Sequence, residues 1–154
     1  MLSVLLPSRR PKDCKEAVES ALSTAEDIEI LVYVDDDDPH KSLYPNAIIG
    51  PPKRSGRAIR HLASLAKGDL MFFGSDDFRW KTKGWDRIFR EKMPAHNLSV
   101  LYPNDMPGGA KGLSPCFSRR FMDETGLFPD VFEHFGPDTW VIAVSYTHLT
   151  LPTN

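Results

Sequence analysis

The sequence predicts an α/β domain built on a mostly parallel sheet. Short apolar segments rich in β-branched residues alternate with segments whose apolar residues recur at helical spacing. Acidic residues stand directly after two of the apolar segments, where ligands bind in such sheets. With 154 residues, 41% hydrophobic and 26% charged, the chain is long enough for one domain with a core.

The first predicted strand and helix lie near the N-terminus. SVLLP, residues 3–7, is a short apolar run that Pro7 ends, as expected of a buried strand. Pro11 suits the first turn of a helix, and apolar positions then recur every three or four residues up to Ala25.

The second predicted strand is IEILVYV, residues 28–34. It is almost wholly apolar, which is typical of a strand covered on both faces. A short edge strand is expected within NAIIGPP, residues 46–52, because two prolines end it. Ser55 is expected to cap a second helix, and Gly68 stands where its C-terminal cap belongs.

The remaining elements continue this alternation. DLMFFG (69–74) predicts the third strong strand, GWDRIFREKM (84–93) a helix, and LSVLY (98–102) a fourth strand. A loop rich in proline and glycine follows. After it, LSPCFS (113–118) predicts a further strand and SRRFMDETG a short helix that Gly126 closes.

Two acidic clusters follow predicted strands. Asp35 to Asp38 come after the second strand, and Asp76 and Asp77 come after the third. The carboxyl ends of parallel strands meet at one edge of a sheet, so both clusters are expected there. Adjacent carboxylates repel each other unless a cation neutralises them, and Mg²⁺ or Mn²⁺ suits carboxylate and phosphate oxygens.

Basic residues are expected at the same edge. Arg9 and Arg10 follow the first strand, and four more lie between positions 53 and 60. Together with the acidic clusters they favour a metal–diphosphate ligand, such as a nucleotide or nucleotide-sugar. The alternatives are a turn or helix cap for Asp76 and Asp77, and a solvated turn for the four earlier aspartates.

Other classes of protein are disfavoured. The net charge of −2 gives no strong electrostatic attraction to nucleic acid. Two cysteines far apart in the sequence indicate neither a disulfide framework nor a zinc site. The sequence has no P-loop, GxGxxG, calcium loop or GxSxG motif. No apolar stretch reaches the length of a membrane span, and the N-terminus does not match a signal peptide. We therefore expect a cytoplasmic protein.

Four segments, in order and spacing, resemble the GT-A glycosyltransferases, especially the large family 2 group. They are SVLLPSRRPKDCKEAVESAL, EILVYVDDDDP, GRAIRHLASLAKGDLMFFGSDDF and FEHFGPDTW. The resemblance covers about residues 2–143 and implies a Rossmann-like, three-layer α/β/α fold. It also implies a metal-dependent transferase, using Mn²⁺ or Mg²⁺. Such an enzyme moves a sugar from a nucleoside-diphosphate-sugar, with a UDP-sugar favoured, to a hydroxyl of a glycan, lipid or small-molecule acceptor.

The resemblance implies a nucleotide site. Pro7 and Arg9 match the loop beside the nucleotide base. Asp35 matches the acid that hydrogen-bonds the base, and Asp36 stands beside it near the nucleoside. Arg57 matches the region that faces the nucleotide.

The resemblance also implies a metal ligand and a catalytic base. Asp77 matches the direct metal ligand, and Asp76 would lie by the ribose or a metal-bound water. Asp138 matches the carboxylate that deprotonates the acceptor in an inverting transfer; a helix N-cap is the alternative for it. Ser75 departs from the family pattern, because it stands where the first Asp of an Asp-x-Asp motif often sits. Direct metal binding therefore rests on Asp77.

Two other functions stay open from the sequence. A sugar nucleotidyltransferase shares the need for a metal and a diphosphate, but usually has a glycine-rich loop after the first strand, which PSRRP lacks. A non-catalytic nucleotide- or glycan-binding module, or an inactive fragment, is the third reading.

The end of the chain differs from the rest. VSYTHLTLPTN resembles translated sequencing-adapter read-through, which recurs at the ends of proteins from assembled short reads. We therefore expect residues 1–143 to be an incomplete catalytic domain from a metagenomic fragment, and residues 144–154 to be a non-native tail. A genuine terminal strand is the alternative.

Overall fold

The computed structural model describes residues 1–93, 98, 100–103 and 114–126. Six strands form its sheet: β1 (Leu2–Pro7), β2 (Ile28–Asp35), β3 (Ile48–Gly50), β4 (Leu70–Phe73), β5 (Val100–Leu101) and β6 (Cys116–Ser118). The helices are α1 (Pro11–Thr24), α2 (Ser55–Leu65), α3 (Trp85–Lys92) and α4 (Arg119–Thr125), with a 3₁₀ turn at Lys41–Leu43.

The strand order is β3-β2-β1-β4-β6-β5. β3, β2, β1 and β4 are parallel, whereas β6 runs antiparallel to both β4 and β5. The predicted α/β fold with a mostly parallel sheet is therefore confirmed. Because β1, β2 and β4 run in one direction, their carboxyl ends meet at the same edge of the sheet.

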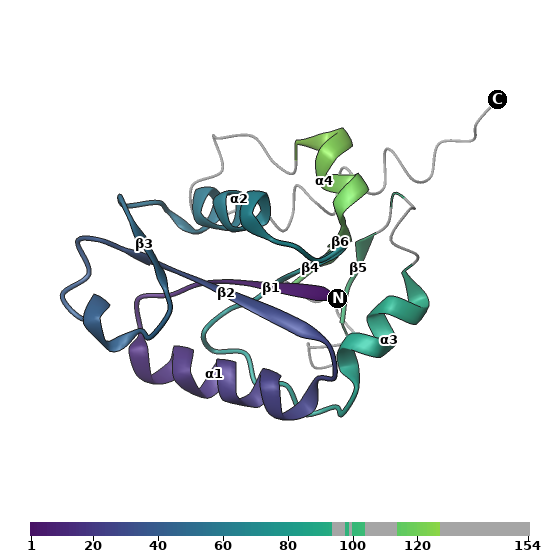
Figure 1. Ribbon diagram of the computed structural model, residues 1–154, viewed down its shortest axis with the longest axis horizontal. Helices are drawn as coiled ribbons and strands as arrows, with labels where there is room; N and C mark the ends of the chain where they lie inside the picture. Colours follow the sequence, from purple (N-terminus) through teal and green to yellow (C-terminus); the bar gives the residue numbers. More distant parts are fainter. Residues whose placement is uncertain (94–97, 99, 104–113, 127–154) are drawn as a thin grey trace.

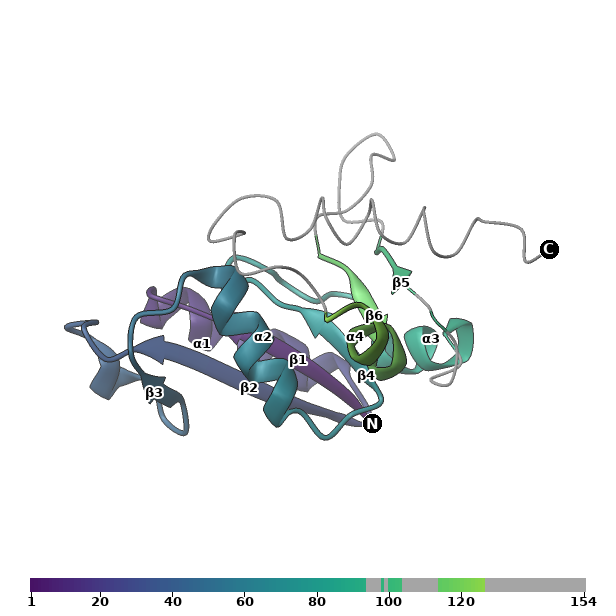
Figure 2. The same ribbon diagram turned by 90° about the horizontal axis from the view of Figure 1, so that it is seen from above.

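Helices cover both faces of the sheet. Figures 1 and 2 show α2 and α4 on one face and α1 and α3 on the other. β4 supplies both cores, since Met71 and Phe73 pack toward α2 while Leu70 and Phe72 pack toward α1 and α3. This explains why its sequence is an unbroken apolar run. Among the described residues, no helix has the length and apolarity that crossing a membrane would require.

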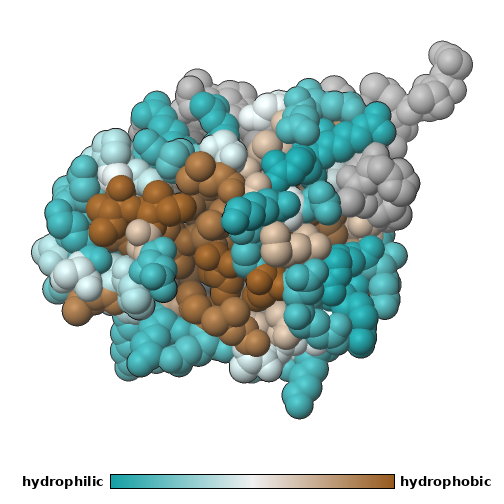
Figure 3. Space-filling model, in the orientation of Figure 1, coloured by the Kyte–Doolittle hydropathy of each residue, from teal (hydrophilic) through white to brown (hydrophobic). Residues whose placement is uncertain are grey.

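β2 is less covered than its sequence predicted. Residues 28–32 are only partly buried, because β3 pairs only with the last three residues, from Tyr33 to Asp35. Within the described part of the chain, no strand lies beside residues 28–32 on that side. Figure 3 shows hydrophobic side chains gathered over β2 and toward α1, where Leu22 is 57% exposed.

Both caps predicted for α2 are wrong. The helix begins at Ser55 itself, so Arg54 occupies the N-cap, and no side chain caps the helix. It ends at Leu65, three residues before Gly68. Gly68 is instead required by a close approach: its N–H donates to Ser3 Oγ at 2.9 Å, and a Cβ there would lie 2.6 Å from that oxygen.

The later elements form in the predicted order, but both strands are shorter than expected. β5 forms only at Val100–Leu101 of the expected 98–102, and β6 only at Cys116–Ser118 of the expected 113–118, whereas α4 forms where expected. Gly126 ends α4 with φ of 67°, the left-handed conformation that a glycine cap allows. Except for Pro103, the predicted loop at 103–112 lies outside the described residues, as do Asp138 and the tail.

Asp86, in the first turn of α3, ties that helix to the turn between α1 and β2. It is fully buried and accepts the N–H groups of Glu26 at 3.0 Å and Asp27 at 2.9 Å. Arg90 Nη1 donates to its Oδ2 at 2.7 Å. Burial alone would raise the pKa of Asp86, but these donors together hold that pKa below its ordinary value.

We predict that Asp86→Asn lowers the free energy of unfolding by about 2 kcal/mol at pH 7, because its NH₂ group would face one of these donors. The folded-state pKa of Asp86 is depressed, so its contribution is present above the unfolded pKa of about 4 and is lost as the pH falls below it. Urea unfolding should therefore show a difference between the two proteins that shrinks below pH 4. Asp123→Asn, at an exposed site on α4, should change the free energy of unfolding by less than about 0.5 kcal/mol. If it destabilised the protein as much as Asp86→Asn does, the loss could not be assigned to the buried hydrogen bonds of Asp86.

Candidate functional site

The side chain of Asp76 lies at the carboxyl end of β4, beside the end of β1. The last pair between the two strands joins Leu5 to Phe73, and Ser8 and Asp76 each lie three residues beyond it. Ser8 Oγ donates to Asp76 Oδ2 at 2.8 Å, and Asp76 is only 7% exposed. A carboxylate this buried requires such donors to offset its lost hydration.

Arg10 supplies the balancing charge. Its Nε donates to Asp76 Oδ2 at 3.2 Å, and its Nη2 donates to Oδ1. The same guanidinium lies 3.9 Å from Asp77 Oδ2 and 3.4 Å from Asp13 Oδ2. The hydrogen bond and charge of Asp76 raise the pKa of Arg10 above its ordinary value. The sequence places Arg10 in a basic pair but gives it no partner, because that partner depends on the register of β1 and β4.

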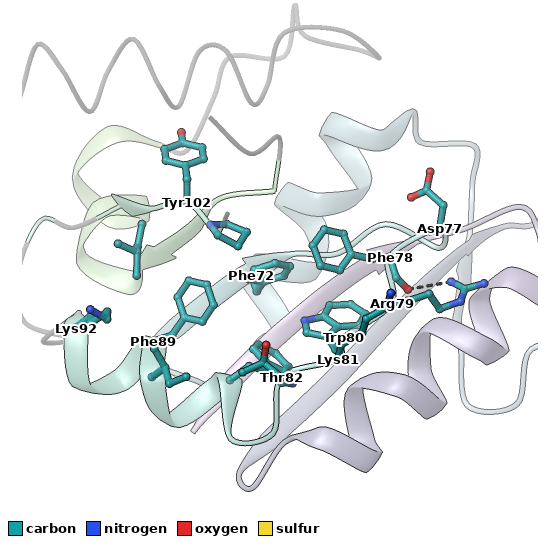
Figure 4. A pocket seen from close by; sticks show the side chains of 14 residues that line it. Phe72, Asp77, Phe78, Arg79, Trp80, Lys81, Thr82, Phe89, Lys92 and Tyr102 are labelled. Carbon is teal, nitrogen blue, oxygen red and sulfur yellow. Dashed lines mark hydrogen bonds between the residues drawn. The ribbon is translucent and has the colours of Figure 1, made fainter. Parts of the chain in front are cut away.

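Asp77 is the exposed member of the acidic pair. Its side chain is 67% exposed, and Figure 4 shows its carboxylate pointing away from the aromatic side chains below it. In the described ranges, no three acidic, His or Cys side chains gather closely enough to hold a metal alone. An exposed carboxylate of this kind nevertheless fits Mg²⁺ or Mn²⁺, because these ions can take most of their oxygen ligands from water and a bound substrate.

Asp35, at the carboxyl end of β2, joins two neighbouring segments. Its Oδ1 accepts the backbone N–H of Lys53 at 2.8 Å, so it ties the segment before α2 to the end of β2. Its Oδ2 lies 3.7 Å from Arg9 Nη1, and Arg9 Nη2 donates to Asp37 Oδ1 at 2.7 Å. The ends of β1 and β2 are thus held together by ion pairs as well as by the hydrogen bonds of the sheet.

These groups surround one cavity, which we name the β1–β2 cleft, with a volume of about 540 Å³. Its lining residues are Pro7, Ser8, Arg9, Arg10, Tyr33, Asp35, Pro52, Lys53, Arg54, Ser55 and Asp76. The lining combines acidic and basic side chains with apolar ones, and its basic side chains suit an anionic ligand.

The structure brings some of the sequence-predicted residues together and separates others. Pro7, Arg9, Asp35 and Asp76 line the β1–β2 cleft. Asp36 and Arg57 are both exposed and are not part of its lining, and Asp77 lines a neighbouring cavity; Asp138 lies outside the described residues. Among the lining residues that contact Asp76 or Asp35, sequence reasoning missed Ser8. It placed Arg10 and Lys53 among the basic residues of this edge but assigned them no partner.

The neighbouring cavity, the aromatic cleft, has a volume of about 880 Å³. Figure 4 shows it between α3, the segment after β4 and the end of β5. Asp77, Arg79, Lys81 and Lys92 also line it. Its aromatic lining consists of Phe72, Phe78, Trp80, Trp85, Phe89 and Tyr102.

Neither cysteine is suited to act as a nucleophile. Both are free and buried. Burial raises the pKa of Cys14 to about 11 and raises that of Cys116 as well. Both thiols are therefore protonated near neutral pH.

No protein-family model matches the chain, and no curated protein sequence does. Solved structures do. A mannosyltransferase, PcManGT from Pyrobaculum calidifontis with GDP-Man and Mn²⁺, aligns at TM-score 0.68 and 12% identity over 84% of this chain. Glucosyl-3-phosphoglycerate synthase from Mycobacterium tuberculosis with UDP aligns at 0.65 and 14% over 97%. S. aureus TarS 1-349 with UDP aligns at 0.60 and 12% over 94%.

The chain therefore has the fold of the GT-A glycosyltransferases, as its sequence resemblance implied. It spans only part of those structures: 47% of the mannosyltransferase, 66% of the synthase and 54% of TarS.

We predict that Arg10→Ala lowers the free energy of unfolding by about 1–2 kcal/mol, because it removes a charged donor from the buried Asp76. Asp76→Asn should reduce that loss, giving a coupling of about 1 kcal/mol in a double-mutant cycle measured by urea unfolding. Arg87→Ala removes a comparably exposed arginine whose partners are on the surface, and should cost less than about 0.5 kcal/mol. Additive effects of the first two changes would show that the pair is not coupled.

Proposed function

We propose that this chain is the nucleotide-binding part of a glycosyltransferase. It would move a sugar from a nucleoside-diphosphate-sugar to an acceptor hydroxyl. The observation that carries the proposal is the meeting of Asp35, Arg9 and Asp76 around the β1–β2 cleft, with Asp77 exposed at its border. The sequence resemblance to family 2 and the GT-A fold of the chain support it.

The nucleoside would lie in the β1–β2 cleft. Asp35 would accept an N–H of the base, and the resemblance favours uracil. Lys53 and Arg9 already hold the Asp35 carboxylate in place, so it needs little rearrangement on binding. Asp76 would lie by the ribose, and Asp36 and Arg57 would contact the nucleotide from outside the cleft.

Asp77 would hold the metal. Mn²⁺ or Mg²⁺ would neutralise the charge that develops on the leaving diphosphate, and Mn²⁺ accompanies GDP-Man in the similar mannosyltransferase structure. Asp77 offers carboxylate oxygens, and diphosphate oxygens and water would complete the coordination. Arg10, fixed by Asp76, adds a positive charge 3.9 Å from Asp77 that also favours the departing diphosphate.

Asp138 would act as the general base of an inverting transfer. It would accept the proton of the acceptor hydroxyl as that oxygen attacks the anomeric carbon. The support for this role is the resemblance of FEHFGPDTW, since the residue lies outside the described part of the chain. Membership of family 2, a cytoplasmic location and the assignment of residues 1–143 to an incomplete catalytic domain belong to the same proposal.

We predict that Asp77→Ala abolishes metal-dependent nucleotide binding while leaving the fold intact. Calorimetric titration of UDP and of GDP, with Mn²⁺ and with EDTA, would measure this. Wild-type protein should bind at least about tenfold more tightly with the metal, since one diphosphate–metal contact is a strong charged interaction. Asp69→Ala, at the other end of the same strand, is the matched control and should bind as wild type. If Asp77→Ala keeps its Mn²⁺-dependent binding, the metal assignment is wrong.

We also predict that Asp138→Asn keeps nucleotide binding and loses transfer. The side-chain amide of asparagine cannot accept the proton of the acceptor hydroxyl, so turnover should fall by a factor of about 10² or more. Release of free nucleoside diphosphate from UDP- and GDP-sugars would be measured beside the titration. Loss of both properties would point to a structural role, and binding without turnover in the wild type would favour a binding module.

A further inference from the structure

Two consecutive carboxylates face different cavities. Asp76 lines the β1–β2 cleft, whereas Asp77 lines the aromatic cleft. The end of β4 is therefore the wall that the two clefts share. Ligands held in both would meet at Asp76 and Asp77, where the proposed transfer takes place.

The floor of the aromatic cleft is a cluster of rings packed against one another. The centre of Phe72 lies 5.7 Å from that of Phe78, 5.8 Å from Trp80, 5.7 Å from Trp85 and 5.6 Å from Phe89, mostly edge to face. A cavity of about 880 Å³ above such a floor is large enough for a small organic molecule. Its apolar lining favours a hydrocarbon or aromatic body over a fully hydrated one.

The rim of the cleft is basic. Arg79 is occupied, because its Nη2 lies 2.6 Å from Glu16 Oε2. Lys81 and Lys92 are exposed, and within the described ranges neither forms an ion pair. Figure 4 shows Asp77 at one end of the cleft and Lys92 at the other, with phenylalanine rings between them. The complementary ligand is elongated, apolar in the middle and anionic at the end far from Asp77.

We infer that the aromatic cleft is the acceptor subsite and that the acceptor is an anionic amphiphilic alcohol. This inference rests on the proposed function. The acceptor hydroxyl at the Asp77 end forms the new bond from its oxygen to the anomeric carbon. The bond from that carbon to the diphosphate breaks, its electron pair leaves with the diphosphate, and the hydroxyl proton passes to the general base of the transfer. The acidic group of the acceptor pairs with Lys92, at the end of the cleft far from Asp77.

The test is calorimetric binding of three probes to the whole chain at low salt, each below its micelle concentration. Octyl phosphate should bind, and hexyl phosphate, with two fewer methylenes, should bind roughly tenfold more weakly. Octyl β-D-glucoside has the same chain without the charge. It should bind about two- to fivefold more weakly than octyl phosphate, as expected for exposed ion pairs.

Matched variants locate the binding. Ile88→Ser, in the aromatic cleft, should weaken octyl phosphate severalfold, whereas Leu22→Ser should not. Leu22 lines a separate apolar cavity of about 700 Å³ between α1 and β2. Lys92→Glu should abolish the preference for phosphate over glucoside, whereas Lys15→Glu, beside that other cavity, should preserve it. The inference would be overturned if the Leu22 variant weakened octyl phosphate binding and the Lys15 variant removed the preference for phosphate, while the Ile88 and Lys92 variants bound as wild type.

The same titrations separate this inference from the proposed function. UDP with Mn²⁺ should bind all four variants as it binds wild type, and should not compete with octyl phosphate. If UDP binds but octyl phosphate does not, or if the two compete, the acceptor subsite is refuted and the nucleotide site stands. If UDP does not bind at all, the proposed function fails, and the acceptor role fails with it even if octyl phosphate binds.

Discussion

The neutralisation of Asp76 is the constraint on which the carboxyl edge depends. β4 is buried on both faces and delivers a carboxylate to a site where water cannot solvate it fully. Ser8 and Arg10 satisfy that carboxylate, and both come from the loop after β1. The loop is thereby fixed against the end of β4. Its position in turn shapes one side of the β1–β2 cleft and sets a positive charge beside Asp77.

Periodicity and composition predict most of the fold. β4 and α4 form where their apolar patterns and the Gly126 cap place them, because those signals are local. β2 was predicted to be covered on both faces, yet its coverage depends on the length of β3, a separate segment whose pairing a local pattern does not contain. The misplaced C-terminal cap of α2 has the same cause: Gly68 is a glycine because of Ser3, which is distant in sequence.

The candidate site shows the same division. Carboxylates after apolar runs identify Asp35, Asp76 and Asp77, since a strand end needs no knowledge of its neighbours. Ser8 was missed and Arg10 was given no partner, because their common partner Asp76 is found only by aligning β1 with β4. Structural neighbours at 12–14% identity keep this fold, which shows how little of the sequence the sheet and its layers require.

The incomplete pairing of β2 divides that strand into two parts with different exchange behaviour. Successive residues of a strand direct their amides to opposite sides, so every second N–H between Ile28 and Val32 faces away from β1. No strand in the described ranges accepts those hydrogens, whereas from Tyr33 onward β3 lies alongside. In deuterated water the outward amides of the first part would exchange without any unfolding, and those of the second only after β3 detaches. Amide exchange rates along β2 would thus report two things: which part of the strand is open to solvent, and how often β3 detaches from the sheet edge that borders the β1–β2 cleft.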